Sequence, residues 1–289
     1  MFERIVLATD LSPDWDQIIG CAKEFKSLGC EQMILTHVMV SSGLAGPHPA
    51  TRSDVLPTLT LQKKQLELLG FNVVVETPTG QPAFSLNEVA EYHFASLIVV
   101  GSHGKSAWRE AILGSVSNAL LHQIRCPVLL INTQRLQEET SGKPCPLRIG
   151  ELLRHVLFPT DFSTVGNGAV MVMKKLIPLG VVETTILHAL EVMEPCPAAV
   201  MAPAEEAAKS CLSALERNLH SAGETRIHNL LIHGHPISII LDLLRKGNIS
   251  MVVMGTQGRG LVTEILLGSV AYNIARLAPC PVLLVPQLC

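Results

Sequence analysis

Glycine and serine recur at one fixed spacing in two segments of this sequence. Each segment has the pattern Gly-x2-Gly-x9-Gly-Ser, and each directly follows an apolar run that is typical of a buried strand. Glycines after a strand allow a close approach of a ligand, and a helix that opens on Gly-Ser presents N–H groups to an anion. The pattern therefore predicts a loop that wraps the phosphate chain of a nucleotide. It occurs at Gly101, Gly104, Gly114 and Ser115, and again at Gly255, Gly258, Gly268 and Ser269.

The rest of the sequence repeats in step with these glycines. Thr9-Asp10-Leu-Ser matches Thr160-Asp161-Phe-Ser, and the stretch Cys-Pro-Val-Leu-Leu follows each glycine pattern about one helix later. Gly-x-Pro also recurs at the same place in each half. The sequence therefore predicts a tandem duplication, with a first domain over residues 1–133, a polar linker over residues 134–150 and a second domain over residues 151–289.

Apolar strands alternate with amphipathic helices in each half. Leu97–Val100 and Met251–Met254 are apolar throughout, which is typical of strands in a parallel sheet that is covered on both faces. We expect an α/β fold in which each half is a five-stranded parallel sheet with helices on both faces, in a Rossmann-like arrangement. Ligands of such sheets bind at the carboxyl ends of the strands, where the Thr-Asp pairs and the glycine loops lie.

Helical spacing predicts several core positions. A helix is expected to begin at Ser12-Pro13-Asp14, which offers an N-cap, a proline and an acid in the first turn, and its core face contains Ile18, Ala22 and Phe25. The last helix of each half is expected to bury an apolar stripe, made of Val116, Ala119 and Leu120 in one and of Val270, Ile274 and Leu277 in the other. Residues 41–57 and 194–203 are rich in Pro, Ala and Gly and are interpreted as loops, with lids over the strand ends as the alternative.

The composition argues against several classes of protein. The chain has 289 residues, a net charge of −3 and no stripe of Lys and Arg, so a nucleic-acid partner is not expected. No apolar run is long enough to span a membrane, and the N-terminal segment reaches an acid too early for a signal peptide. The eight cysteines contain no Cys-x2-Cys pair, so zinc spacing is absent and disulfides are not needed at this size. We expect a protein of the reducing cytoplasm.

Charged and polar residues near the glycine loops extend the candidate site. Asp10 and Asp161 end the first strand of each half, where an acid could meet ribose hydroxyls or a phosphate-bound Mg²⁺, or could cap the following helix. Lys105 and Arg259 each follow the second glycine, either beside a phosphate or in solvent. His37 and His188 end the second strand, and we favour a satisfied polar role for both over a role beside the base.

At these residues the chain resembles the universal stress proteins, as two such domains in one polypeptide. The resemblance implies the family fold, which is like that of the adenine nucleotide alpha hydrolases, and ATP or AMP as the ligand. It places adenine and ribose against Thr9, Asp10 and the Val38 backbone, and the phosphates against the four glycine-pattern residues of the first half. The matching residues of the second half are Thr160, Asp161, Ala189, Gly255, Gly258, Gly268 and Ser269.

The resemblance also implies how the domains pair. Domains of the family usually associate through their last strands, which are expected here at Val128–Ile131 and Val282–Val285. A tandem chain can form that pair within itself, so we expect an intrachain pseudo-dimer, and a homodimer as a further assembly.

The function expected from this reading is a nucleotide-binding regulatory or stress-response module with little or slow hydrolysis, because no catalytic base is evident. One alternative is an adenine-nucleotide-dependent hydrolase or transferase, although the Thr-Asp-x-Ser loop differs from the Ser-Gly-Gly-x-Asp-Ser loop of relatives that use pyrophosphate chemistry. Another is a nucleotide-free interaction protein. If the halves differ, we expect the first to bind more firmly, because Gly166 and Gly168 weaken the helix that follows Asp161, and because Gln257 replaces His103.

Overall fold

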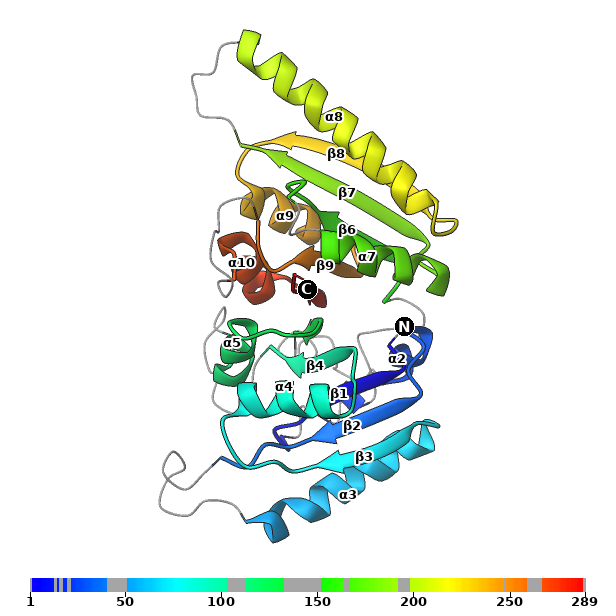
Figure 1. Ribbon diagram of the computed structural model, residues 1–289, viewed down its shortest axis with the longest axis vertical. Helices are drawn as coiled ribbons and strands as arrows, with labels where there is room; N and C mark the ends of the chain where they lie inside the picture. Colours follow the sequence, from blue (N-terminus) through cyan, green and yellow to red (C-terminus); the bar gives the residue numbers. More distant parts are fainter. Residues whose placement is uncertain are drawn as a thin grey trace. The chain divides into compact units, whose positions relative to one another are not determined.

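The chain divides into two compact units, Met1–Gly150 and Glu151–Cys289 (Figure 1). The expected linker, residues 134–150, lies outside the described part of the chain. The computed structural model describes residues 2–12, 15, 18–19, 22–40, 51–102, 113–132, 152–163, 167–191, 198–246, 248–258 and 267–287.

The first unit is a parallel sheet with the strand order β3-β2-β1-β4-β5. Its strands are β1 (Arg4–Ala8), β2 (Gln32–Thr36), β3 (Asn72–Glu76), β4 (Leu97–Gly101) and β5 (Val128–Ile131). Its helices are α2 (Lys23–Ser27), α3 (Arg52–Leu68), α4 (Pro82–Tyr92) and α5 (Ser115–Leu121).

The second unit repeats this arrangement, with the strand order β8-β7-β6-β9-β10. Its strands are β6 (His155–Pro159), β7 (Glu183–Leu190), β8 (Arg226–His233), β9 (Met251–Gly255) and β10 (Val282–Val285). Its helices are α7 (Asn167–Leu176), the 3₁₀ helix η2 (Ile177–Leu179), α8 (Ala198–His220), α9 (Pro236–Arg245) and α10 (Ser269–Leu277).

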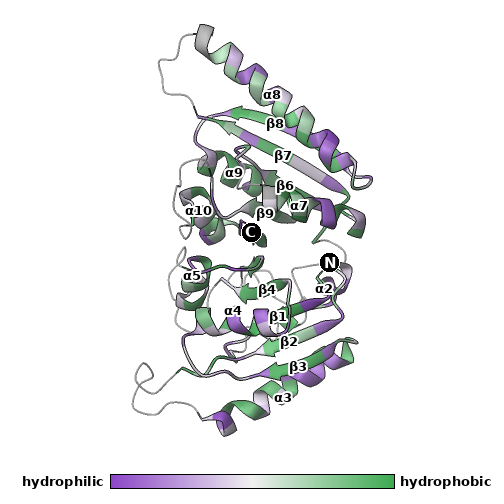
Figure 2. Ribbon diagram, viewed as in Figure 1, coloured by the Kyte–Doolittle hydropathy of each residue, from purple (hydrophilic) through white to green (hydrophobic). Residues whose placement is uncertain are grey.

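The core of each unit is the sheet itself. Ile5, Val6 and Leu7 in β1 are all 0% exposed, because helices cover both faces of the sheet and successive side chains point to opposite faces. Figure 2 shows hydrophobic colours along the inner strands, whereas α3 and α8 alternate between hydrophobic and hydrophilic residues. The predicted fold class, two α/β domains with parallel sheets, is confirmed.

The first predicted helix agrees with the structure where the structure describes it. Trp15, Ile18 and Ile19 are helical, while Pro13 and Asp14 lie outside the described residues. The predicted core face is confirmed, since Ile18, Ala22 and Phe25 are each 0% exposed.

The two segments interpreted as loops are partly helical, so that interpretation was wrong for residues 52–57 and 198–203. These residues open α3 and α8. Pro57 and Pro203 each lie in the second turn of their helix, where a proline removes one backbone hydrogen bond, so both helices form despite this cost. A capping box begins α3: the Asp54 carboxylate accepts hydrogen bonds from the Thr51 backbone at 2.8 Å and hydroxyl at 2.7 Å. Residues 41–50 and 192–197 lie outside the described ranges.

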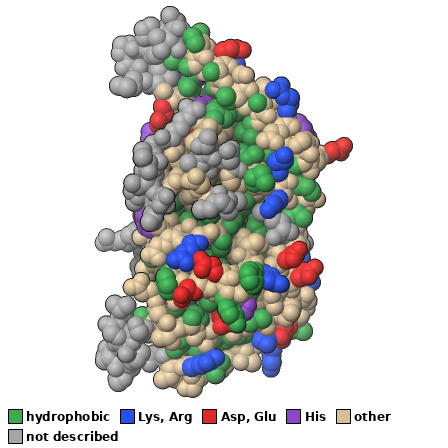
Figure 3. All heavy atoms as spheres, in the orientation of Figure 1, with side chains coloured by type: hydrophobic (Ala, Val, Ile, Leu, Met, Phe, Trp, Pro, Cys, Tyr) green, Lys and Arg blue, Asp and Glu red, His purple; other side chains and the backbone are tan. Residues whose placement is uncertain are grey.

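Charges of both signs are spread over the surface. Figure 3 shows Lys and Arg side chains interspersed with Asp and Glu on the face that it draws. Within the described ranges, no helix combines the length and the hydropathy that crossing a membrane requires.

Candidate functional site

A cavity of about 230 Å³ opens at the carboxyl ends of the strands in the first unit. Its walls come from the residues that follow β1, β2 and β4 and from the first turns of α4 and α5. These are the elements that the strand order brings together at the point where the crossovers change direction. The candidate residues that line the cavity are Thr9, Asp10, Val38, Gly101, Gly114 and Ser115.

The second unit has a corresponding cavity of about 710 Å³ at the ends of β6, β7 and β9. The candidate residues that line it are Thr160, Asp161, Ala189, Gly255, Gly258, Gly268 and Ser269. The structure therefore gathers the candidate residues of each half in one place wherever it describes them. Gly104, Lys105 and Arg259 lie outside the described residues.

The Thr-Asp pair at the end of the first strand folds into the same tight turn in both units. Asp10 Oδ1 accepts the Ser12 N–H at 2.9 Å, and Thr9 Oγ1 accepts the Leu11 N–H at 3.1 Å; the same two bonds in the second unit are both 3.0 Å long. The turn holds Leu11 at a φ of 60° and Phe162 at 58°. A bulky residue in this region costs about 1–3 kcal/mol. The side-chain bonds hold the strained turn, so each aspartate has a structural role here.

Each histidine at the end of the second strand is bonded to that turn. His37 Nδ1 donates to the Thr9 carbonyl at 2.8 Å, and His188 Nδ1 donates to the Thr160 carbonyl at 2.8 Å. A carbonyl only accepts, so the proton lies on Nδ1 in both rings. The His188 ring also lies 4.4 Å from the ring of Phe162. The satisfied polar role predicted for both histidines is confirmed.

The backbone of the second strand turns toward each cavity an edge that has no strand beside it in the part of the chain that the structure describes. The Thr36 carbonyl accepts the N–H of Thr9, the residue directly after β1, whereas the next residue, His37, donates its backbone N–H to Glu76 in β3. Because the bonding direction alternates along a parallel strand, the backbone groups of Val38 face the β1 side again, beyond the last residue of β1. The same alternation places the backbone of Ala189 beyond the end of β6. These N–H and C=O groups are positioned to form hydrogen bonds with the edge of a planar ring.

Two glycines of the second motif are required by their neighbours. A β-carbon on Gly258 would lie 2.7 Å from Asp161 Oδ2, which is closer than such contacts occur, and one on Gly268 would lie 3.3 Å from the Thr256 carbonyl. Gly258 therefore admits the carboxylate, and Gly268 lets α10 begin against the loop after β9. Packing alone accounts for part of the glycine pattern.

The prediction for the start of the last helix in each unit was wrong for one N–H group. The N–H of the third glycine was expected to be exposed to an anion, but Gly114 donates to the Ser102 carbonyl at 2.8 Å and Gly268 donates to the Thr256 carbonyl at 2.7 Å. The first bond along α5 runs from the Asn118 N–H back to the Gly114 carbonyl. The N–H groups of the three residues in between have no acceptor within the helix, so they are the donors that an anion could use.

The prediction that an apolar stripe of each last helix is buried in the core is wrong for the first residue of the stripe. Leu120 and Ile274 are 0% exposed as expected, but Val116 is 36% exposed and lines the first cavity, and Val270 lines the second. The other members of the two stripes are half-buried. The first turn of each helix stands above the ends of the strands, so the valine there faces the cavity instead of the sheet.

Several cavity residues were not singled out from the sequence. Pro82 and Leu86 on α4 and Pro236 and Ile240 on α9 line the cavities of their units, and Trp15 lines the first cavity. The repeated Gly-x-Pro was the available signal for the two prolines, each of which is the first residue of its helix. Nothing in the repeat marked Trp15.

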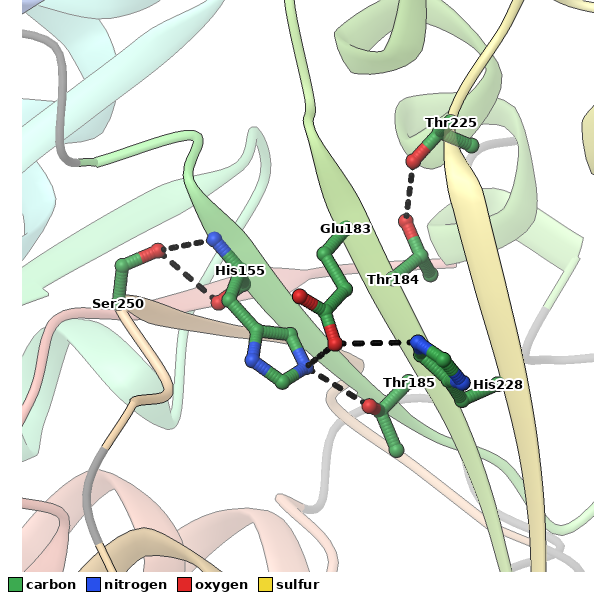
Figure 4. Close-up of polar contacts among 7 residues, drawn as sticks. All are labelled: His155, Glu183, Thr184, Thr185, Thr225, His228 and Ser250. Atoms are coloured by element: carbon green, nitrogen blue, oxygen red, sulfur yellow. Dashed lines mark hydrogen bonds and ion pairs between the residues drawn. The ribbon is translucent and has the colours of Figure 1, made fainter.

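A second polar cluster lies at the amino ends of β6 and β7 in the second unit (Figure 4). Glu183 Oε1 lies 3.1 Å from His228 Nε2 and 3.7 Å from His155 Nε2, and His155 Nε2 also lies 2.8 Å from the Thr185 hydroxyl. The Ser250 hydroxyl accepts the His155 N–H at 2.9 Å and thereby ties the start of β6 to the segment before β9. Burial lowers the pKa of His155, and the opposing effect of Glu183 is smaller.

This lowered pKa predicts a loss of stability in acid. Below the ordinary value of 6.5, the unfolded chain takes up a proton on this histidine before the folded chain does, so the free energy of unfolding falls as the pH decreases. His155→Gln is expected to make this fall shallower when urea unfolding is followed from pH 7.5 to pH 5. The slope of the free energy of unfolding against pH should decrease by an amount that corresponds to less than one bound proton. Arg4→Gln is the matched control, because Arg4 opens β1 as His155 opens β6 and arginine stays charged throughout. Equal slopes for wild type and His155→Gln would contradict the prediction.

Two of the described cysteines are chemically quiet. Burial raises the pKa of Cys30 and that of Cys126 to about 12, so both remain thiols at neutral pH. Cys126 and Cys280 stand at matching repeat positions, are half-buried and are not joined in disulfides. Among the described residues, no group of three or more His, Cys, Asp and Glu side chains is arranged to hold a metal ion.

Comparisons with known proteins identify the family. The model of the universal stress protein family matches residues 1–132 and again residues 153–286. A universal stress protein of Mycolicibacterium smegmatis is 25% identical over 299 residues, which cover 97% of this chain and 96% of that protein. One of Methanocaldococcus jannaschii is 29% identical over 154 residues, which cover 45% of this chain and 95% of that protein.

A solved structure agrees over the whole chain. The crystal structure of a universal stress protein from Archaeoglobus fulgidus DSM 4304 matches with a TM-score of 0.72 and 22% sequence identity, and the match covers 100% of both chains. At this identity the likeness shows the fold alone. Together with the two family matches, it shows that the chain belongs to the universal stress protein family and carries two copies of its domain.

Proposed function

We propose that this protein binds an adenine nucleotide, ATP or AMP, at the strand ends and acts as a nucleotide-responsive regulatory module. The observation that carries the proposal is the cavity itself, which occurs twice. In each unit the Thr-Asp turn, an unpaired backbone edge and the opening of the last helix meet around one space. The resemblance of the glycine pattern to that of ATP-binding family members supports the same ligand.

The base and the ribose are assigned to the side of the cavity formed by the first two strands. The unpaired N–H and C=O groups of Val38 or Ala189 would pair with the edge of adenine. The carboxylate of Asp10 or Asp161 lies on the cavity wall beside them and would accept hydrogen bonds from the ribose hydroxyls. Its Oδ1 atom already accepts a backbone N–H in the turn, so the fold fixes the direction of the carboxylate.

The phosphates are assigned to the side formed by the last helix. The first-turn N–H groups of α5 and α10 point out of their helices, and the helix dipole favours an anion there. Ser115 and Ser269 open these helices with exposed side chains whose hydroxyls would donate to phosphate oxygens. Magnesium would enter with the phosphates, and the nearest carboxylates for it are those of Asp10 and Asp161.

We propose that any hydrolysis is slow. In both cavities the aspartate and the histidine that line the wall are engaged in holding the Thr-Asp turn, as described above, and a general base must be free to take a proton from water. Occupancy of the cavity, rather than turnover, would then be the signal that partners of the protein read.

The proposal is tested by denaturing freshly purified protein and analysing the released small molecules by mass spectrometry, with phosphate measured per chain. We expect ATP, ADP or AMP to be released from the wild type and to be absent from the double variant Gly101→Asp/Gly255→Asp, which places a carboxylate in each cavity wall. An empty wild-type protein that also shows no thermal shift with ATP and Mg²⁺ would contradict nucleotide binding. The glycines would then serve packing alone.

A further inference from the structure

The two cavities stand at matching repeat positions but differ about threefold in volume. The first measures about 230 Å³ and the second about 710 Å³. Cavities that hold small-molecule ligands or cofactors measure roughly 300–1,000 Å³. The second cavity lies inside this range and the first lies below it, so the duplicated motif does not give two equivalent sites.

A tryptophan occupies the wall of the smaller cavity. Trp15 lines it and is only 5% exposed, and its backbone N–H donates to the Ser12 carbonyl at 3.1 Å, directly after the Thr-Asp turn. The residue at the matching repeat position is Gly166, which lies outside the described residues. A tryptophan side chain therefore lines the first cavity, and the sequence of the second half has a residue without a side chain at the matching position.

Smaller side chains also widen the second cavity. Ala189 stands where the first unit has Val38, and Ala169 lines the second cavity at the repeat position of Ile18. The second cavity also extends along the glycine loop, where Thr256–Gly258 form part of its wall. The second cavity therefore reaches the side on which a phosphate chain would lie.

We propose that only the second unit binds a nucleotide with its phosphate chain, and that Trp15 fills the equivalent space in the first unit. This inference rests on the proposed function, since it names which of the two sites is used. It reverses the order of nucleotide affinity expected from the sequence, in which the first unit binds more firmly. The space that the small residues leave in the second cavity then affects binding more than the helix-weakening glycines after Asp161 do.

The inference is tested by counting ATP molecules bound per chain, by native mass spectrometry with Mg²⁺ present. We expect one per wild-type chain, one in Gly101→Asp and none in Gly255→Asp. Trp15→Gly, which copies the second unit, is expected to bind two, and Trp15→Phe, which keeps an aromatic ring in place, is expected to bind one.

A second variant tests the inference independently if Trp15→Gly fails to fold. Ala189→Val copies the first unit into the second and is expected to weaken ATP binding by at least about tenfold, which corresponds to about 1.4 kcal/mol. Two ATP molecules per wild-type chain, or one that is lost in Gly101→Asp and kept in Gly255→Asp, would overturn the inference but leave the proposed function standing. Absence of ATP from every variant would overturn both.

Discussion

Gly258→Ala is expected to weaken ATP binding by the second unit about tenfold or more, and to lower the free energy of unfolding by about 1–3 kcal/mol, as overpacking does. The added β-carbon would lie 2.7 Å from Asp161 Oδ2, so the carboxylate or the glycine loop must move. The other carboxylate oxygen holds the strained turn at Phe162, so the shift also releases that turn. Calorimetric titration measures the first effect and urea unfolding the second.

A double-mutant cycle shows whether Asp161 is the reason for this glycine. In an Asp161→Ala background the clashing oxygen is absent, so the unfolding penalty of Gly258→Ala should nearly vanish. The coupling between the two substitutions is then expected at about 0.5–3 kcal/mol, as for other residues in contact. The cycle is read by stability, because Asp161→Ala itself removes a proposed ribose ligand. An equal penalty in both backgrounds would mean that a different neighbour requires the glycine.

The sheet and the place of the site were predictable because both depend on strong local signals. Buried parallel strands must be apolar along their length, so Leu97–Val100 and its repeat stand out, and the loops that follow them must share one edge of the sheet. The repeat doubled each signal. Duplicated Thr-Asp and Gly-Ser pairs in the same strand–helix context indicated the strand ends at which both cavities lie.

The errors arose where tertiary packing or a weak local cue decides the outcome. Proline content favoured a loop at residues 52–57, but the Thr51–Asp54 capping box begins a helix there. The valine in the first turn of each last helix fits an apolar stripe by spacing, yet the position of that turn above the strand ends places Val116 in the wall of the cavity. Trp15 lines the first cavity, but nothing in the repeat marked it, because the fold and not a local pattern places it there.

His188→Leu is expected to lower the free energy of unfolding by about 1–3 kcal/mol and to weaken ATP binding by the second unit. Leucine fills much of the space but cannot donate to the Thr160 carbonyl, which His188 Nδ1 reaches at 2.8 Å. His188 is only 7% exposed, so the carbonyl that loses its donor gains little from water. The Thr-Asp turn beside it loosens, and the Asp161 carboxylate is no longer held in place. Urea unfolding and calorimetric titration with ATP measure the two effects.

His188→Asn separates the hydrogen bond from the other properties of the ring. The asparagine Nδ2 is attached to Cγ as the histidine Nδ1 is, so it can donate to the same carbonyl while the ring contact with Phe162 is lost. We therefore expect His188→Asn to restore most of the ATP affinity that His188→Leu loses, and equal damage from both would contradict the bond as the cause. His37→Leu is the matched variant in the first unit, because His37 makes the same bond to Thr9. It should cost similar stability, and since the nucleotide is assigned to the second unit, it should leave ATP binding unchanged.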